Sequence, residues 1–365
     1  MSSAGVGPIL CFATQGHEHI EGERIRALLE PLDPSSFTFE RSGKLGSARR
    51  LMRAIEAQRP ALVVMEGTGT AGGLTLIAMN ARHGIPFVVS SGDAVGPFLH
   101  LHSPLVGALG DVYERLLMRR CAGFIGWTPY LVGRAMTLGA PRGMTAAGWT
   151  RGQARDGARE RVREQLGIPA DSLVVGLAGS LHWNDRVEYG YGAELVRAIG
   201  MVERRDVAVC IVGDGSGRAR LEAMAGEDLG SRVFMPGRVA PEEVPDYLAA
   251  LDIGTLSQSV DGVGAFRYTT KLSEYLAAGL PVITTEIPLA YDLDEGYMWR
   301  LPGRAPWSAT HVDALARLLA DVSAEEVQAR REAIARRHGD PFDRDAQQQR
   351  ACAFVTDLLA DLARG

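Results

Sequence analysis

Glycine-rich turns follow the apolar runs in the second half of the chain. They occupy residues 178–180, 213–217, 236–239 and 261–267. Glycine lets backbone N–H groups approach a ligand closely, and the start of a helix gathers unpaired N–H groups with a partial positive charge. Arg267 and Lys271 add two cationic side chains at the last of these turns. The combination of glycine turns and nearby cations favours binding of a diphosphate group.

The run Gly213–Gly217 contains part of a dinucleotide-binding fingerprint. Arg218 stands where the third glycine of that fingerprint is required, and no acidic residue closes a clear second strand about 20 residues later. A dehydrogenase that binds a nicotinamide dinucleotide is therefore a poor interpretation of this sequence.

Polar residues also follow three apolar runs of the first half, at 15–18, 66–69 and 90–93. Asp93, Glu66 and His17 are our candidates for orienting a hydroxyl nucleophile or taking its proton, since carboxylates and imidazole do this work in enzymes. Alternatively, each of these residues has only a structural role, as a helix cap or a turn residue. The spaced histidine pairs His17/His19 and His100/His102 lack an apparent third ligand, so we expect no metal site.

Short apolar runs alternate with longer amphipathic stretches along the whole chain. Continuous apolar strands between helices indicate parallel sheets that are covered on both faces. The expected strands are residues 8–13, 61–65, 85–90, 123–127, 173–178, 207–212, 232–235, 253–256 and 281–284. The clearest expected helices are 22–29, 104–120, 191–202, 218–225, 241–250, 271–278 and 351–363.

An Arg-rich stretch, residues 150–164, divides this α/β pattern into two halves. We interpret it as a linker between two doubly wound, Rossmann-like domains that face a central cleft. The predicted domains are 1–150 and 151–340, and a last helix within 341–365 is predicted to cross back to the first domain.

Composition excludes several classes of protein. The 365 residues carry a formal charge of −5, which gives no overall electrostatic signal for nucleic acid. The four cysteines are widely separated and fit a reducing, cytoplasmic environment. We expect no signal peptide and no transmembrane segment, because no apolar run approaches 18 residues. We interpret the basic clusters Arg49–Arg50 and Arg119–Arg120 as solvated helix faces rather than as a membrane or polyanion patch, while peripheral contact with a membrane stays open.

The second half resembles the donor-binding domain of GT-B glycosyltransferases, especially the retaining family four (group 1). The resemblance covers residues 170–300, and its most specific part is the stretch 271–282, KLSEYLAAGLPV. The first half matches that family mainly in the order of its strands and helices. The resemblance implies two Rossmann-like domains, a nucleoside diphosphate sugar as donor, and transfer with retention and without a metal cofactor.

The resemblance also assigns roles to particular residues. Arg186 corresponds to a basic residue that grips the diphosphate, while Ser180 stands where the family has an Arg. Glu274 corresponds to the acidic residue that holds the ribose hydroxyls, and Phe266 stands where many members have a second Glu. The other positions that the resemblance or the glycine turns assign to the donor are Gly16, Gly213, Asp214, Gly237, Arg238, Val239, Gly264, Ala265, Arg267 and Lys271, with backbone N–H groups of residues 264–266 offered to the donor sugar and phosphate.

The predicted activity is hexosyl transfer from a UDP- or GDP-sugar to an acceptor. The acceptor is a sugar of a polysaccharide, a lipid-linked glycan or a small metabolite. Two alternatives stay open: a sugar-nucleotide epimerase of the same form, and a non-catalytic protein that binds nucleotide sugars. At least one of UDP, GDP and ADP is expected to stabilise the protein, less so in Glu274→Ala.

Overall fold

The computed structural model describes residues 7–17, 19–101, 103–150, 152–267 and 270–364. The chain divides into two compact units. The first unit contains three pieces of the chain: the residues up to Gly148, the pair Phe266 and Arg267, and the segment from Pro341 onward. The second contains the residues from Trp149 to Ala265 and from 270 to Asp340. The division along the chain falls at residue 148, beside the predicted bound of 150.

The first unit is built on a six-stranded parallel sheet with the order β2-β1-β3-β4-β5-β6. Its strands are β1 (Ile9–Ala13), β2 (Ser35–Ser36), β3 (Leu62–Glu66), β4 (Phe87–Ser91), β5 (Gly123–Gly126) and β6 (Gly143–Thr145). Its α-helices are α1 (Ile20–Leu29), α2 (Lys44–Gln58), α3 (Thr70–His83), α4 (Val95–His100), α5 (Pro104–Arg120), α6 (Pro129–Leu138) and α15 (Arg344–Arg364).

The second unit has a second six-stranded parallel sheet with the order β12-β11-β10-β7-β8-β9. Its strands are β7 (Leu173–Ala178), β8 (Val207–Val212), β9 (Val233–Gly237), β10 (Ile253–Leu256), β11 (Val282–Thr285) and β12 (Met298–Leu301). Its α-helices are α7 (Ala158–Leu166), α8 (Ala193–Ile199), α9 (Arg218–Ala225), α10 (Val244–Ala249), α11 (Thr270–Ala277), α12 (Leu289–Asp292), α13 (Ala309–Asp321) and α14 (Ala324–Arg336).

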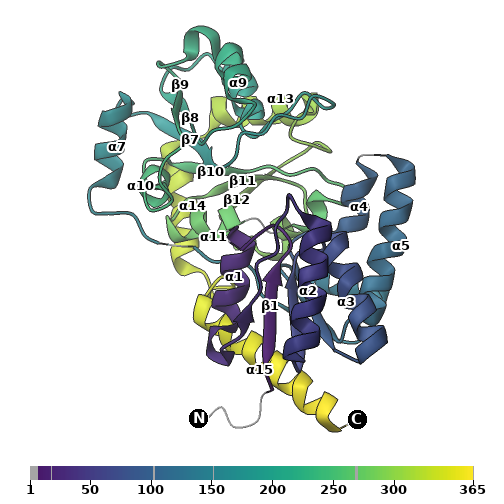
Figure 1. Ribbon diagram of the computed structural model, residues 1–365. Coiled ribbons are helices and arrows are strands. Elements are labelled where there is room, and N and C mark those ends of the chain that lie inside the picture. The colour runs from purple at the N-terminus through teal and green to yellow at the C-terminus, as the bar shows by residue number, and fades with distance from the viewer. Residues whose placement is uncertain (1–6, 18, 102, 151, 268–269, 365) are drawn as a thin grey trace. The chain divides into compact units, whose positions relative to one another are not determined.

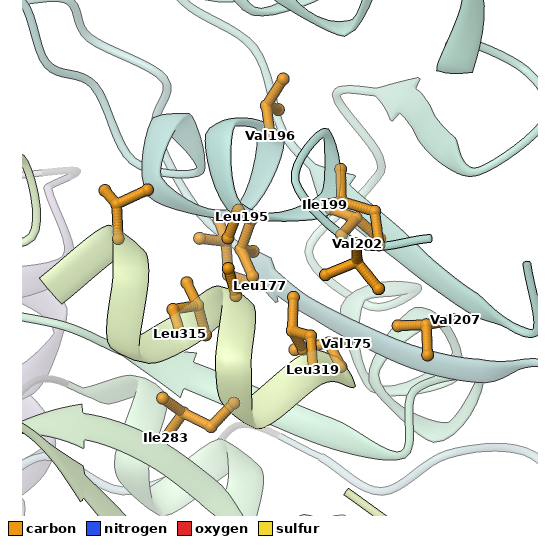
Figure 2. Close-up of a cluster of buried hydrophobic side chains, with 14 of the residues drawn as sticks. Val175, Leu177, Leu195, Val196, Ile199, Val202, Val207, Ile283, Leu315 and Leu319 are labelled. Carbon is orange, nitrogen blue, oxygen red and sulfur yellow. The ribbon is translucent and has the colours of Figure 1, made fainter. Parts of the chain in front are cut away.

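These sheets confirm the predicted fold class of two Rossmann-like domains. The central strands β1, β3, β7 and β8 are buried almost throughout, as expected for strands that helices cover on both faces. In the second unit, α8 and α13 pack over the sheet. Leu315 of α13 lies near Leu177 of β7, and Leu319 lies near Val175 (Figure 2). The apolar runs of the sequence thus form the cores that position the strand ends.

The final helix belongs to the first unit. Helix α15, yellow in Figure 1, packs beside α1. Gln348 Nε2 donates a hydrogen bond to the carbonyl oxygen of Ala27 at 2.6 Å, and Ala351, Val355 and Leu358 are buried. The chain therefore returns to its first unit after completing the second.

The Arg-rich stretch is not a solvated linker throughout its predicted length, because α7 begins at Ala158 within it. Arg163 is buried, and its Nη2 lies 2.7 Å from Asp252 Oδ2. Arg155 Nε donates to Asp246 Oδ2 at 2.6 Å. Ion pairs with two acids of the second unit thus fix this stretch onto that unit, which sequence composition alone does not indicate.

No helix among the described residues is long and apolar enough to cross a membrane.

Candidate functional site

Three of the four glycine turns meet at the carboxyl ends of neighbouring strands in the second unit. The N–H of Gly179 donates to the carbonyl of Val212 at 2.9 Å, and the N–H of Gly213 donates to the carbonyl of Gly237 at 2.8 Å. The turns after β7, β8 and β9 are therefore joined side by side. The sequence predicts that these turns converge at one edge of a parallel sheet, and the hydrogen bonds show that three of them do.

Glycine is required at the centre of this arrangement. Gly213 has a φ of +140°, and a Cβ atom there would collide with the carbonyl oxygen of Gly179. Gly237 has a φ of +90°, a conformation that side-chain-bearing residues rarely adopt. We name the joined turns at Gly179, Gly213 and Gly237 the glycine edge.

Lys271 lies at the glycine edge. A Cβ on Gly179 would lie 3.1 Å from Lys271 Nζ, so this ammonium group stands directly over the first turn. The same Nζ is 4.5 Å from the centre of the Tyr191 ring, which holds the lysine by a cation–π contact. A cation fixed beside converging glycine turns is suited to an anionic group such as a diphosphate.

The turn around Gly264 is organised differently from the prediction. The N–H groups of Val263 and Gly264 donate to Asp261 Oδ1, at 2.8 and 3.0 Å, and the N–H of Ala265 donates to the carbonyl of Asp261 at 3.0 Å. The backbone donors of Gly264 and Ala265 are therefore already used by Asp261. The expectation that they bind the donor sugar and phosphate does not fit this geometry.

The remaining predicted donor residues have varied surroundings. Asp214 is an exposed turn residue whose Oδ1 accepts the N–H of Gly215 at 2.8 Å. Arg186 lies in an exposed turn, where its N–H donates to Asn184 Oδ1 at 3.0 Å. Glu274 is half-buried on α11, one turn beyond Lys271. Beside the glycine edge, Ser180 and Arg238 are exposed and Val239 is half-buried.

Glu66, a predicted catalytic residue, is fully buried in an ion pair. Its Oε2 lies 2.8 Å from Arg24 Nη1, and its Oε1 accepts a hydrogen bond from Trp127 Nε1 at 2.8 Å. The guanidinium of Arg24 also lies 4.5 Å from the centre of the Trp127 ring. With both oxygens engaged and no exposed surface, Glu66 does not fit a base that receives a proton from a substrate. It stabilises the ends of β3 and β5 instead.

Asp93, by contrast, is accessible. Its side chain is 49% exposed, and its Oδ1 accepts a hydrogen bond from Arg267 Nε at 2.7 Å. Phe266 and Arg267, predicted to contact the donor, thus belong to the first unit: Thr128 Oγ1 donates to the carbonyl of Phe266 at 2.8 Å, and Arg134 lies over the Phe266 ring. The structure brings a predicted catalytic residue and a predicted donor residue into one ion pair.

His17 and Gly16 lie in the loop that joins β1 to α1. His17 is half-buried, and its Nδ1 lies 3.0 Å from Arg26 Nη1. Gly16 has a φ of +118° and open space beside it. The close approach of α1 to this loop depends on Gly22, where a Cβ would collide with the carbonyl oxygen of His17.

Sequence reasoning missed Glu21, in the first turn of α1. Its Oε2 is buried and makes no hydrogen bond with any described residue. Burial raises the pKa of Glu21 to about 8, with further contributions from the negative charges of Glu66 and Asp93. Such a carboxyl group is protonated near neutral pH and provides a hydrogen-bond donor. Its local sequence looks like an ordinary acidic helix start. The raised pKa depends on burial and on neighbouring charges that only folding brings close, so the sequence does not indicate it.

His100 Nε2 and Asp111 Oδ2 are hydrogen-bonded at 2.8 Å, while His102 lies outside the described residues. No group of three His, Cys, Asp or Glu side chains suited to a metal ion occurs within the described part of the chain.

Two family models match the chain, one on each unit. The model of group 1 glycosyl transferases matches residues 172–321, and that of the glycosyl transferase 4-like domain matches residues 9–147. The chain belongs to the group 1 glycosyltransferases. The predicted enzyme class, a glycosyltransferase of GT-B form, is thereby confirmed, and the narrower placement in family four is compatible with both models.

Individual relatives of this glycosyltransferase are distant. A Bacillus subtilis (strain 168) protein, named as the teichuronic acid biosynthesis glycosyltransferase TuaH, is 33% identical over 67 residues, which are 18% of this chain and 17% of that protein. The structure of Anabaena HepE in complex with UDP and glucose has a TM-score of 0.68 at 16% identity, covering 96% of this chain and all of HepE. A Listeria monocytogenes structure described as a UDP-N-acetylglucosamine 2-epimerase has a TM-score of 0.59 at 14% identity, covering 97% of both chains. The fold is thus common to both enzyme types.

Proposed function

We propose that this glycosyltransferase moves a sugar from a uridine diphosphate sugar to a hydroxyl group of an acceptor sugar. The observation that carries the proposal is Lys271 Nζ over the glycine edge of the second unit. Negative charge develops on the diphosphate as the bond to the sugar breaks, so a fixed cation lowers the barrier. The UDP in the HepE complex supports uridine as the base.

The second unit provides the groups for the donor. Lys271 meets the diphosphate, and Glu274, one helical turn away, binds the ribose hydroxyls. Arg238 and Val239 follow the last glycine of the edge and meet the base. Ser180 is placed next to Gly179 and adds a hydroxyl group near the phosphates.

The first unit provides the groups for the acceptor. Arg267 engages Oδ1 of Asp93, which leaves the other oxygen of this half-exposed carboxylate to orient the acceptor hydroxyl. His17 Nδ1 is engaged by Arg26, so His17 acts as a binding residue rather than as a base through that atom. The reaction proceeds with retention and without a metal ion, with the departing phosphate taking the proton of the hydroxyl group. The anomeric configuration of the product, read by proton NMR, and activity in the presence of EDTA test these two points.

A stripe of exposed apolar side chains on α5 favours an acceptor presented at a membrane. Leu105, Leu109 and Val112 are 73%, 65% and 67% exposed, and their spacing places them on one side of the helix. The helix ends in the exposed cations Arg119 and Arg120. Apolar side chains next to basic ones are typical of helices that lie on anionic lipid. We therefore propose peripheral membrane contact through this stripe and a lipid-linked glycan as acceptor.

Thermal-shift measurements with UDP, GDP and ADP test the donor proposal. UDP is expected to raise the melting temperature most, because a ligand that binds only the folded state stabilises it. Lys271→Ala should weaken UDP binding about ten- to hundredfold, since it removes a charged hydrogen bond, and Lys271→Arg should restore part of it. Lys44, the other lysine of the sequence, gives the matched control Lys44→Ala. If none of the three nucleotides binds, the donor assignment is wrong.

Incubation with a UDP-sugar alone tests the two remaining alternatives. Isomerisation of the sugar without any acceptor would identify an epimerase. Tight donor binding without turnover across a broad panel of acceptors would identify a non-catalytic binding protein.

A further inference from the structure

A cavity of about 860 Å³, wide open to solvent, lies in the first unit at the carboxyl end of β1. It is formed by the loop between β1 and α1 and by the segment that follows β2. This volume is in the range of small-molecule sites. Its lining residues are Gln15, Gly16, His17, His19, Thr38, Phe39, Glu40, Arg41 and Ser42.

The hydrogen bonds of the two lining histidines determine which of their ring nitrogens carries the proton. Arg26 can only donate, so its contact with His17 makes Nδ1 of that histidine the acceptor. His19 caps α1, and its Nδ1 accepts the N–H of Glu21 at 3.4 Å. With Nδ1 as acceptor, each ring carries a hydrogen on Nε2. Neither Nε2 has a hydrogen-bond partner among the residues that the structure describes, so both remain available as donors.

Arg41 gives the cavity a positive charge. Its guanidinium forms no hydrogen bond or ion pair with any described residue, whereas Glu40, the one acid among the described lining residues, is paired with Arg50 at 3.1 Å. Burial, followed by the charge of Arg41, lowers the pKa of His19, so this ring is neutral at pH 7 and keeps Nδ1 as an acceptor. Arg41 is close enough to act on both His19 and Glu21.

Within the part of the lining that the structure describes, a cation that has no counter-ion thus lies with two imidazole N–H donors. Arg41 is exposed, and a carboxylate or phosphate offers its guanidinium several acceptor oxygens and a negative charge, which a neutral sugar hydroxyl does not. We propose that this cavity is an acceptor subsite that binds a carboxylate or phosphate group carried by the acceptor sugar, with Arg41 as its main determinant of specificity. This inference rests on the proposed function, since it assumes that the first unit binds the acceptor.

Binding of three small probes to the full chain tests the subsite. Glucuronate carries a carboxylate, glucose 6-phosphate carries a phosphate, and glucose carries neither. Calorimetric titration should detect the two anionic probes and show glucose to bind at least tenfold more weakly. The preference between glucuronate and glucose 6-phosphate then indicates whether the acceptor is a uronic acid or a phosphorylated sugar.

Arg41→Gln should weaken binding of the preferred anionic probe about ten- to hundredfold, as expected for loss of a charged hydrogen bond. Arg41→Lys should retain part of the affinity. Arg53→Gln on the exposed surface of α2 is the matched control and should leave it unchanged. UDP binding should be the same in all these proteins.

Two results would overturn the subsite: anionic probes that bind no better than glucose, or equal affinity in Arg41→Gln and Arg53→Gln. A loss of UDP binding in Arg41→Gln would assign the cavity to the donor and would also overturn it. Failure of the proposed function is recognised separately, because the unaltered protein would then not bind UDP.

Discussion

Arg24 Nη1 lies 2.8 Å from Glu66 Oε2, and both side chains are buried. Arg24 also donates to Ser90 Oγ at 3.1 Å and to the carbonyl oxygen of Ala146. One guanidinium thus joins the carboxyl ends of β3 and β4 to the segment that follows β6.

The first prediction concerns this ion pair. Glu66→Gln should lower the free energy of unfolding by about 3–5 kcal/mol, because it leaves the charge of Arg24 buried without a counter-ion. Glu30→Gln, which removes an exposed contact with Arg344, should cost less than about 1 kcal/mol. Denaturant unfolding measures both values. A Glu66→Gln protein with normal stability and no transferase activity would return Glu66 to the catalytic candidates.

The second prediction concerns Glu21 and pH. Its pKa is raised from 4.5 to about 8 in the folded state, so the folded protein holds this proton more tightly than the unfolded chain does. This contribution to stability is fully present below pH 4.5 and is lost as the pH rises to about 8. Arg24 and Arg41 partly offset the effects of burial and of the Glu66 and Asp93 charges.

Glu21→Gln should therefore melt at a higher temperature than the unaltered protein at pH 9. The difference should be about 2–4 °C for each kcal/mol recovered, and it should disappear near pH 4.5. Scanning calorimetry across this range provides the measurement. Parallel pH curves for the two proteins would show that Glu21 ionises normally.

The third prediction concerns Asp93 as the residue that orients the acceptor hydroxyl. Asp93→Asn should lower kcat about 10²-fold, the loss typical of a reacting group that is no longer held in position. The KM for the donor and the affinity for UDP should stay unchanged. Arg267→Gln removes the partner of Asp93 and should give a smaller loss, which is not additive with that of Asp93→Asn. Equal and additive losses would mean that the two residues act independently.

The fourth prediction concerns the apolar stripe of α5. Replacing Leu105, Leu109 and Val112 together by Gln should reduce binding to phosphatidylglycerol vesicles at least tenfold, because the apolar area that lipid would bury is lost. Met201, another exposed apolar side chain, in the second unit, provides the control Met201→Gln. Co-sedimentation measures binding, and phosphatidylcholine vesicles test the role of Arg119 and Arg120. Vesicle binding that survives the triple change would assign the contact to another surface.

The sequence by itself determined the two α/β units and the positions of their main strands. Runs such as 173–178 and 207–212 became strands with the same bounds, because an apolar segment of that length between helices has few other ways to bury its side chains. The glycine turns could also be predicted from the sequence, because glycine itself permits a positive φ such as that of Gly213. Short or weakly apolar elements such as β2 and β6 escaped detection, because pairing with neighbouring strands stabilises them rather than their own composition.

Only the tertiary structure decided what the polar residues do. Glu66 and Asp93 look alike in the sequence, as acids at the ends of apolar strands, yet one is buried against Arg24 and the other is half-exposed beside Arg267. Those partners lie 42 and 174 residues away. The ionisation and accessibility of a carboxyl group depend on the charges and solvent around it, and distant parts of the chain supply both only after folding.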